Sequence, residues 1–357
     1  MNSTSLPTKN HKKRKHKRVT FKPNRDGILA LIALVLVIAV VVTAVVFLSK
    51  LIIYSVNESK ETNQSGDTLP GDNNNPVTTP WNNAYINTPY ANSNISVGDL
   101  ILVNSNNTYA FVDSIKDKNT TNLYKYEGHG SYYVLPGSDT RVHSSMISSL
   151  KQMIFDMVDT NETLGTTSSS DRIFITGAYR DTTLQTTLNT NNPSLYPEAP
   201  GYSEHHTGLA VDIKVLSDSA TVQLRDNEYM WLESNCTKYG FVLRYDGSKM
   251  NLTGIADEPY HLRYVGVPHA TYMTENNLCL EEYLELLRTS HKYEDAPLEI
   301  AAGDKEYLVY YVAANTAEGS NFTSIPVPPA SEGTYTISGD NMNGFVVTVE
   351  KTAQTGN

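Results

Sequence analysis

The pattern of hydrophobic and polar residues divides the chain into segments of different character. Residues 27–48 are almost all apolar and include no charged side chain. A run of this length fits a transmembrane helix, which needs about 20 residues to cross a bilayer. A cleavable signal peptide is the alternative, but its apolar core usually holds only about 7–15 residues. We therefore predict an uncleaved single-pass transmembrane helix at 27–48 that contacts the lipid bilayer.

The segment before this span is strongly basic. Residues 1–26 carry nine Lys or Arg and only one acidic residue, Asp26. Basic residues next to a span lie on the cytoplasmic side, so we expect a cytoplasmic tail at the plasma membrane and an extracellular remainder. Membrane topology explains the basic run without nucleic acid as a partner. Because the whole chain has a net charge of −10, the part after residue 26 is acidic and unsuited to binding polyanions.

Residues 49–95 have a different composition, dominated by Asn, Ser, Thr, Pro and Gly. Such a segment has too little apolar surface to form a core of its own. We expect it to be a flexible extracellular tether between the membrane and a folded domain.

From residue 96 to 290 the pattern is that of a folded domain. Apolar residues at helical spacing predict a helix at 145–158, and further helices are predicted at 181–188, 226–239 and 274–288. Short apolar runs predict strands at 100–103, 172–176, 209–215, 241–245 and 261–266. Helices and strands mix without strict alternation, which favours an α+β fold with a small antiparallel sheet and flanking helices.

Residues 291–357 are rich in strand-forming residues and show no helical pattern. Strands are predicted at 306–314, 334–338 and 344–350, separated by Pro and Gly turns. This segment is either a small β-rich module or an extension that packs on the preceding domain. The two cysteines, Cys236 and Cys279, could form one disulfide, and the sequence leaves their pairing open.

Two adjacent histidines stand out in the stretch SEHHTGLAVD, residues 203–212. Either His205 or His206 could be a metal ligand, or the pair could belong to a polar loop before a strand. A hydrolytic zinc needs three protein ligands, an open position and a nearby base. His205 and Asp212 are joined by a turn with Gly208 and a strand, so the two side chains can converge on one ion.

A second stretch, EPYH at 258–261, offers a third ligand and a base. Pro259 argues against a helix, so we expect a bent entry into the strand at 261–266. Such a bend can direct His261 to the metal and leave Glu258 beside the reacting water. A structural zinc would need four closed ligands, usually including cysteines, and no cysteine lies near these residues in the sequence.

These motifs together resemble those of a known family. The pattern S-x-H-x-x-G-x-A-x-D at 203–212, the pattern E-x-x-H at 258–261 and the upstream GAYRD at 177–181 occur in the expected order. They are similar to the motifs of VanY-type D-alanyl-D-alanine carboxypeptidases. The same zinc peptidase group contains D-Ala-D-Ala dipeptidases and L,D-carboxypeptidases. The resemblance covers roughly residues 96–290.

The resemblance implies a cleft that holds one Zn²⁺ ion. It implies His205, Asp212 and His261 as the metal ligands and Glu258 as the catalytic general base. The position of His206 is left free by the pattern, so the resemblance favours His205 of the adjacent pair.

The resemblance also implies how the substrate is held. Arg180 is expected to bind the terminal carboxylate of the peptide, because a guanidinium pairs bidentately with a carboxylate. Ser203 is expected to line the substrate cleft, and Gln185 is expected to assist Arg180.

We therefore predict a membrane-anchored zinc D,D-carboxypeptidase that removes the terminal D-alanine from peptidoglycan stem peptides. Three alternatives remain open: an L,D-carboxypeptidase that acts on tetrapeptide stems, an endopeptidase that cuts cross-bridges, and a non-catalytic wall-binding module that keeps the zinc. An intact Glu258 argues against the binding module, because a binder has no use for a base.

Overall fold

The computed structural model describes most of the chain after residue 84. The described residues are 85–160, 172–196, 198–217, 220–222, 226–330 and 333–352. The predicted span at 27–48 and the basic tail lie outside these ranges. Among the described residues, no helix has both the length and the apolar character that crossing a membrane requires.

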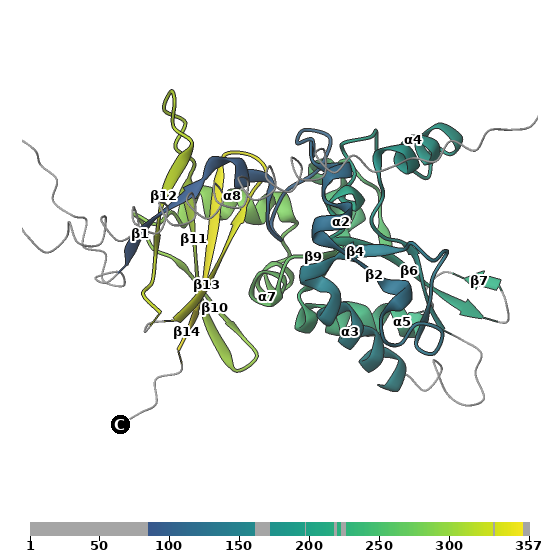
Figure 1. Cartoon of the computed structure of the whole chain (residues 1–357). Helices are drawn as coiled ribbons and strands as arrows, with labels where there is room; N and C mark the ends of the chain where they lie inside the picture. The colour runs from purple at the N-terminus through teal and green to yellow at the C-terminus, as the bar shows by residue number, and fades with distance from the viewer. Residues whose placement is uncertain are drawn as a thin grey trace, which may run out of the picture. The chain divides into compact units, whose positions relative to one another are not determined.

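The centre of the fold is a sheet of six strands. In spatial order it contains β3 (Tyr133–Val134), β5 (Arg172–Gly177), β6 (Ala210–Ser217), β9 (Glu258–Tyr264) and β8 (Phe241–Tyr245), and β7 (Ala220–Val222) pairs with β6. Only the short β3–β5 pair is parallel, and the other pairs are antiparallel. The mixed α+β class is confirmed by this arrangement (Figure 1).

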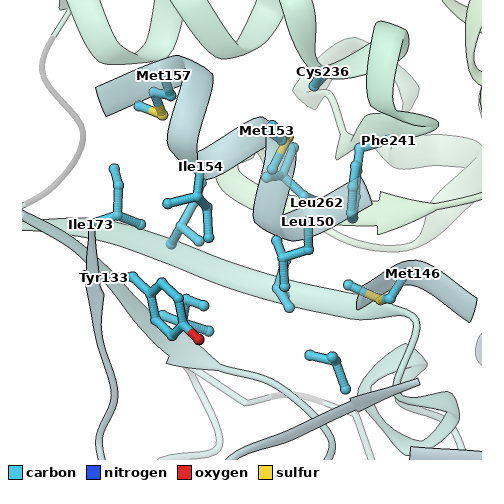
Figure 2. Packing of buried hydrophobic residues seen from close by; sticks show 14 of the residues in the cluster. Tyr133, Met146, Leu150, Met153, Ile154, Met157, Ile173, Cys236, Phe241 and Leu262 are labelled. Carbon is cyan, nitrogen blue, oxygen red and sulfur yellow. The ribbon is translucent and has the colours of Figure 1, made fainter. Parts of the chain in front are cut away.

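The helix α3 (Ile147–Thr160) covers this sheet because its apolar residues recur every three or four positions. Leu150, Met153, Ile154 and Met157 are almost fully buried, and they meet Ile173 of β5 in one cluster. Figure 2 shows Leu150 and Ile154 projecting from α3 toward the strands. The cluster fixes the position of the strands that carry the candidate site.

The other helices of this region are short. They are α2 (Lys116–Asn119), α4 (Thr182–Asn191), α5 (Asp226–Asn235) and α6 (Met250–Thr253), and a separate two-stranded sheet pairs β2 (Thr120–Asn122) with β4 (Arg141–His143). Asp181 caps α4, since its carboxylate accepts a hydrogen bond from the backbone N–H of Leu184 at 2.7 Å. The predicted helix at 226–239 ends earlier, at Asn235, and continues as a 3₁₀ turn to Tyr239.

A second sheet is formed by the C-terminal part of the chain. Its order is β10 (Leu298–Ala302), β11 (Lys305–Ala313), β14 (Gly344–Lys351) and β13 (Gly333–Gly339), all antiparallel. The helices α7 (Val267–Glu275) and α8 (Leu280–Ser290) share a buried cluster with this sheet, in which Leu284 and Leu287 meet Ile300 and Val309. The C-terminal segment thus packs on the preceding helices.

The strand β1 (Ile86–Ala91) pairs along its whole length with β12 (Phe322–Val327), as Figure 1 shows. The two strands are joined to the second sheet by a cluster that includes Tyr90, Ile325 and Phe345. The end of the predicted tether is therefore structured, and folded residues begin before the expected boundary at 96. Cys236 and Cys279 are both buried and free.

Two sequence predictions for elements were wrong. Residues 100–103 form no strand, although all four are buried. Alternate side chains enter two different clusters, with Leu100 in one and Ile101 in the other, so burial without sheet pairing explains the apolar run. The predicted helix at 274–288 is two helices, because Asn277 adopts a positive φ of 50° and a capping box at Cys279 starts α8 anew.

Candidate metal centre

Three buried side chains from different elements converge at the middle of the central sheet. His205 lies on the 3₁₀ turn Glu204–Thr207, Asp212 on β6 and His261 on β9. One donor atom from each residue can be chosen so that all three lie within 4.8 Å of one another. His205 Nε2 is 3.2 Å from Asp212 Oδ2, and His261 Nδ1 is 2.9 Å from Asp212 Oδ1. The structure thus brings together the three residues expected to bind metal.

The sheet register explains how two of these side chains meet. Asp212 and His261 are directly opposite in the β6–β9 pair, so their side chains project from the same face. On the other side, Asp212 is opposite Gly177 of β5. A Cβ at Gly177 would lie only 2.1 Å from Asp212 Oδ2, so the glycine leaves the space that the carboxylate occupies.

The two adjacent histidines have different surroundings. The Nδ1 atom of His205 is 2.8 Å from the Ala178 carbonyl oxygen, which leaves Nε2 facing the cluster. The Nε2 atom of His206 accepts a hydrogen bond from Gly201 N at 2.9 Å, so its Nδ1 must donate to the Arg180 carbonyl at 2.8 Å. Both nitrogens of His206 are therefore used within the protein, and His206 is a buried structural residue.

The protonation of the three donors favours a cation between them. Burial lowers the pKa of His205 to about 4, with a further contribution from the Arg180 guanidinium. Burial alone would raise the pKa of Asp212, but His205 and His261 outweigh it and hold the pKa well below its usual range. Burial would lower the pKa of His261, yet the Asp212 and Glu204 carboxylates raise it to about 9. A metal would replace the proton at His261 Nδ1.

These residues fit a catalytic zinc site. Two imidazoles and one carboxylate, all buried, are the donor set that catalytic zinc uses when a further position stays open. No cysteine belongs to this donor cluster among the described residues, which argues against a closed structural site. The arrangement can therefore hold a Lewis-acidic ion with a free coordination position.

Glu258 lies beside the cluster as the first residue of β9. Its Oε2 atom is 3.8 Å from His261 Nδ1, the nitrogen that faces the cluster. Burial raises the pKa of Glu258 to about 7, and the nearby Asp212 and Glu198 carboxylates add to the shift. A carboxyl group with a pKa near the working pH suits a general base that also returns the proton.

Arg180 lies in the same cleft, but part of its guanidinium is already paired. Its Nη2 donates to Asp212 Oδ2 at 2.8 Å and its Nη1 donates to Gln185 Oε1 at 3.4 Å. The guanidinium also lies over the Tyr196 ring, 5.1 Å from the ring centre. Gln185 is fully buried and holds the Glu198 carbonyl at 2.8 Å, so it supports Arg180 and the following loop.

The cleft at the cluster has a volume of about 80 Å³. Ser203 is in its wall and is 2% exposed. The cleft has further lining residues that the sequence motifs did not indicate, which are Thr176, Leu195, Tyr196, Glu198, Glu204, Lys214, Tyr245 and Tyr260. Lys214 was detectable, because it follows Asp212 by two positions in a strand and so shares its face. Glu198 lies in an irregular loop, for which the sequence gives no pattern.

Comparisons with known proteins identify the family. The family model described as VanY, D-alanyl-D-alanine carboxypeptidase, matches residues 141–267. A D-alanyl-D-alanine carboxypeptidase of Enterococcus faecium is 32% identical over 252 residues, which cover 71% of this chain and 75% of the relative. One from Enterococcus faecalis is 48% identical over 86 residues, covering 24% of this chain and 31% of the relative.

A solved structure gives a consistent result. The vancomycin resistance D,D-dipeptidase VanXYg, in complex with a D-Ala-D-Ala phosphinate analogue, superposes with a TM-score of 0.59 and 25% identity. The match covers 75% of this chain and 99% of that chain. The resemblance inferred from the motifs is confirmed, and the chain belongs to the VanY family of D-alanyl-D-alanine carboxypeptidases, which are zinc hydrolases.

Proposed function

We propose that the protein is a zinc D,D-carboxypeptidase, anchored in the plasma membrane, that removes the terminal D-alanine from peptidoglycan stem peptides. The observation that carries the proposal is the composition of one cleft, in which three metal donors, Glu258 and Arg180 all meet. The proposed residues for one zinc ion are His205, Asp212 and His261. When bound, zinc supplies a Lewis acid that makes water a stronger nucleophile at neutral pH and polarises a carbonyl.

Glu258 is proposed to move the proton. In its ionised form, one carboxylate oxygen takes a proton from the attacking water, and the same oxygen then gives it to the departing amine. Its position 3.8 Å from His261 Nδ1 places it next to the metal donors without making it one of the three. Burial raises the pKa of Glu258 to about 7 before zinc binds, so the carboxyl group is a stronger proton acceptor than an exposed glutamate.

The rest of the cleft supports a small terminal residue with a free carboxylate. The cleft volume of about 80 Å³ is well below the roughly 300–1,000 Å³ of pockets for larger ligands, which favours alanine. Arg180 and Lys214 are the arginine and the lysine in its lining. We propose that Arg180 binds the terminal carboxylate, with Gln185 fixing its orientation and Ser203 lining the wall.

The membrane and wall parts of the proposal are supported by the sequence. The uncharged run at 27–48 follows nine basic residues, which favours a single span with a cytoplasmic N-terminus and an extracellular enzyme. On this topology the tether places the cleft beside the stem peptides of the wall.

The test is to incubate the zinc-loaded protein with pentapeptide and tetrapeptide stems and to measure the product masses. The proposal predicts loss of one alanine from a pentapeptide ending in D-Ala-D-Ala, insensitive to β-lactams because no serine nucleophile takes part. Loss of alanine from the tetrapeptide alone would assign an L,D-carboxypeptidase. Cleavage of cross-linked muropeptides alone would assign an endopeptidase, and intact peptides with bound zinc would assign a binding module.

A further inference from the structure

Glu204 is a fully buried carboxylate that the proposed mechanism does not use. Its Oε1 atom accepts hydrogen bonds from Arg244 Nε at 2.9 Å and from Arg263 Nη1 at 3.0 Å. The side chains of Glu204 and Arg263 have no exposed area, and that of Arg244 is 1% exposed. Burial of three charged groups carries a large desolvation cost, so a contribution to stability alone does not explain why these residues are buried together.

The second oxygen of Glu204 faces a metal donor. Both arginine bonds go to Oε1, and Oε2 has no hydrogen-bond partner among the described residues. It lies 3.6 Å from His261 Nε2, which is also buried and without a hydrogen-bond partner there. The opposite nitrogen of the same ring, Nδ1, faces Asp212 and Glu258. His261 is thus held between the metal cluster on one side and Glu204 on the other.

The other histidine of the cluster has an equivalent partner. His205 turns Nε2 toward the cluster and places Nδ1 2.8 Å from the Ala178 carbonyl. Histidines that bind metal generally donate their second N–H to a carbonyl or a carboxylate, which fixes the ring and its tautomer. His261 has a carboxylate in the place where His205 has a carbonyl.

We propose that Glu204 is a positioning residue for zinc, which accepts the Nε2–H of His261 and thereby directs Nδ1 at the ion. The inference rests on the zinc site of the proposed function. In this arrangement Arg244 and Arg263 do more than neutralise the charge of Glu204, because their hydrogen bonds also fix the orientation of its carboxylate. Arg263 is itself held by the Asp99 and Ile101 carbonyl oxygens, each 2.9 Å from its Nη2. Glu204 therefore has little freedom to turn away from His261.

The substitution Glu204→Gln separates this role from simple charge pairing. Glutamine has nearly the same shape, and its oxygen can still accept from an arginine, but its amide group then presents N–H toward His261 Nε2–H. The control is Glu281→Gln on α8. Glu281 accepts from Arg244 Nη2 at 2.7 Å and so belongs to the same charge group, but it is not the residue opposite His261.

The measurement is zinc affinity, obtained by competition between metal-free protein and a chromophoric chelator, with the melting temperature of each metal-free variant recorded. Glu204→Gln should weaken zinc binding by about 10- to 100-fold, the usual effect of losing such a partner. Glu281→Gln should stay close to wild type. If Glu204→Gln does not fold, Glu204→Asp serves instead. Aspartate keeps the negative charge, but its shorter side chain places the carboxylate farther from His261.

The outcomes separate the two proposals. Equal zinc affinity of the wild type and the Glu204 variant overturns the positioning role and leaves the proposed function intact. Equal losses in the Glu204 and Glu281 variants also overturn it, because charge pairing alone would then explain the effect. Failure of the wild type itself to bind zinc would instead refute the proposed function.

Discussion

The substitution Gly177→Ala tests whether the space beside Asp212 is needed for the site. Gly177 is opposite Asp212 in the β5–β6 pair and is not among the glycines with a positive φ. Its backbone therefore accepts alanine, and the only new feature is one methyl group. That group would lie 2.1 Å from Asp212 Oδ2 and 2.7 Å from Asp212 Cγ, with Arg180 Nη2 at 3.0 Å.

The size of the displacement follows from these distances. Ordinary contacts to carbon begin near 3.4 Å, so the carboxylate must move by about 1 Å or more. Metal–ligand distances tolerate only about 0.2 Å, and a misplacement of about 1 Å in an active site can cost about 10²-fold in rate. We expect Gly177→Ala to reduce kcat/KM by about 10²-fold and to weaken zinc binding.

The assay is release of D-alanine from a D-Ala-D-Ala pentapeptide, together with a zinc competition titration. Gly137→Ala is the matched control, because no atom lies within 4 Å of its added Cβ and its φ is not positive. If Gly177→Ala keeps both zinc affinity and kcat/KM within a few-fold of Gly137→Ala, the inferred packing of Asp212 is wrong.

Three further predictions address the base, the anchor and the second sheet. Glu258→Gln should keep zinc while the turnover rate falls by about 10²–10⁴-fold. In the wild type, kcat/KM should rise with pH until Glu258 is ionised, at a pKa of about 7 or below, because bound zinc lowers the pKa of Glu258. A Glu258→Gln protein with the turnover rate of the wild type would refute the role of Glu258 as general base. Arg180→Ala should lose the wild-type preference for a free over an amidated C-terminus, and equal discrimination in both proteins would contradict the anchor. His269 lies on α7, and its Nε2 is 3.0 Å from the Thr348 hydroxyl of β14 in the second sheet. Burial lowers the pKa of His269 to about 3, so the unfolded chain takes up this proton at a higher pH than the folded protein, and stability falls as pH drops below about 6.5. Measured by urea unfolding, the free energy of unfolding of the wild type should fall by about 2 kcal/mol more than that of His269→Gln between pH 7 and pH 5. Equal falls in the two proteins would contradict this prediction.

The residues that sequence reasoning located share a local signature. The spacing of His205 and Asp212 across a glycine turn, and of Glu258 and His261 across a proline, can be read within ten residues. The helix α3 and the strands β5, β6 and β8 were predicted because their apolar patterns are strong and bounded by turn residues.

Other features depend on contacts that local patterns do not contain. The pairing of β1 with β12 joins segments more than 200 residues apart, and Pro326 in β12 weakens the strand signal. The residue Glu204 lies inside the recognised motif, but its partners Arg244 and Arg263 come from β8 and β9. At 100–103 a strand was predicted that does not form, because an apolar pattern indicates burial and not hydrogen-bond pairing.

The most direct test of the account is the recovery of activity as zinc is added back to metal-free protein. The account predicts that release of D-alanine from the pentapeptide is absent in the metal-free protein and rises to a plateau at one zinc per chain. His206→Ala should recover in this titration, whereas His205→Ala should not, because of these two adjacent histidines only His205 turns a ring nitrogen to the cluster. Release of D-alanine without metal, or recovery by His205→Ala at one zinc per chain, would contradict the account.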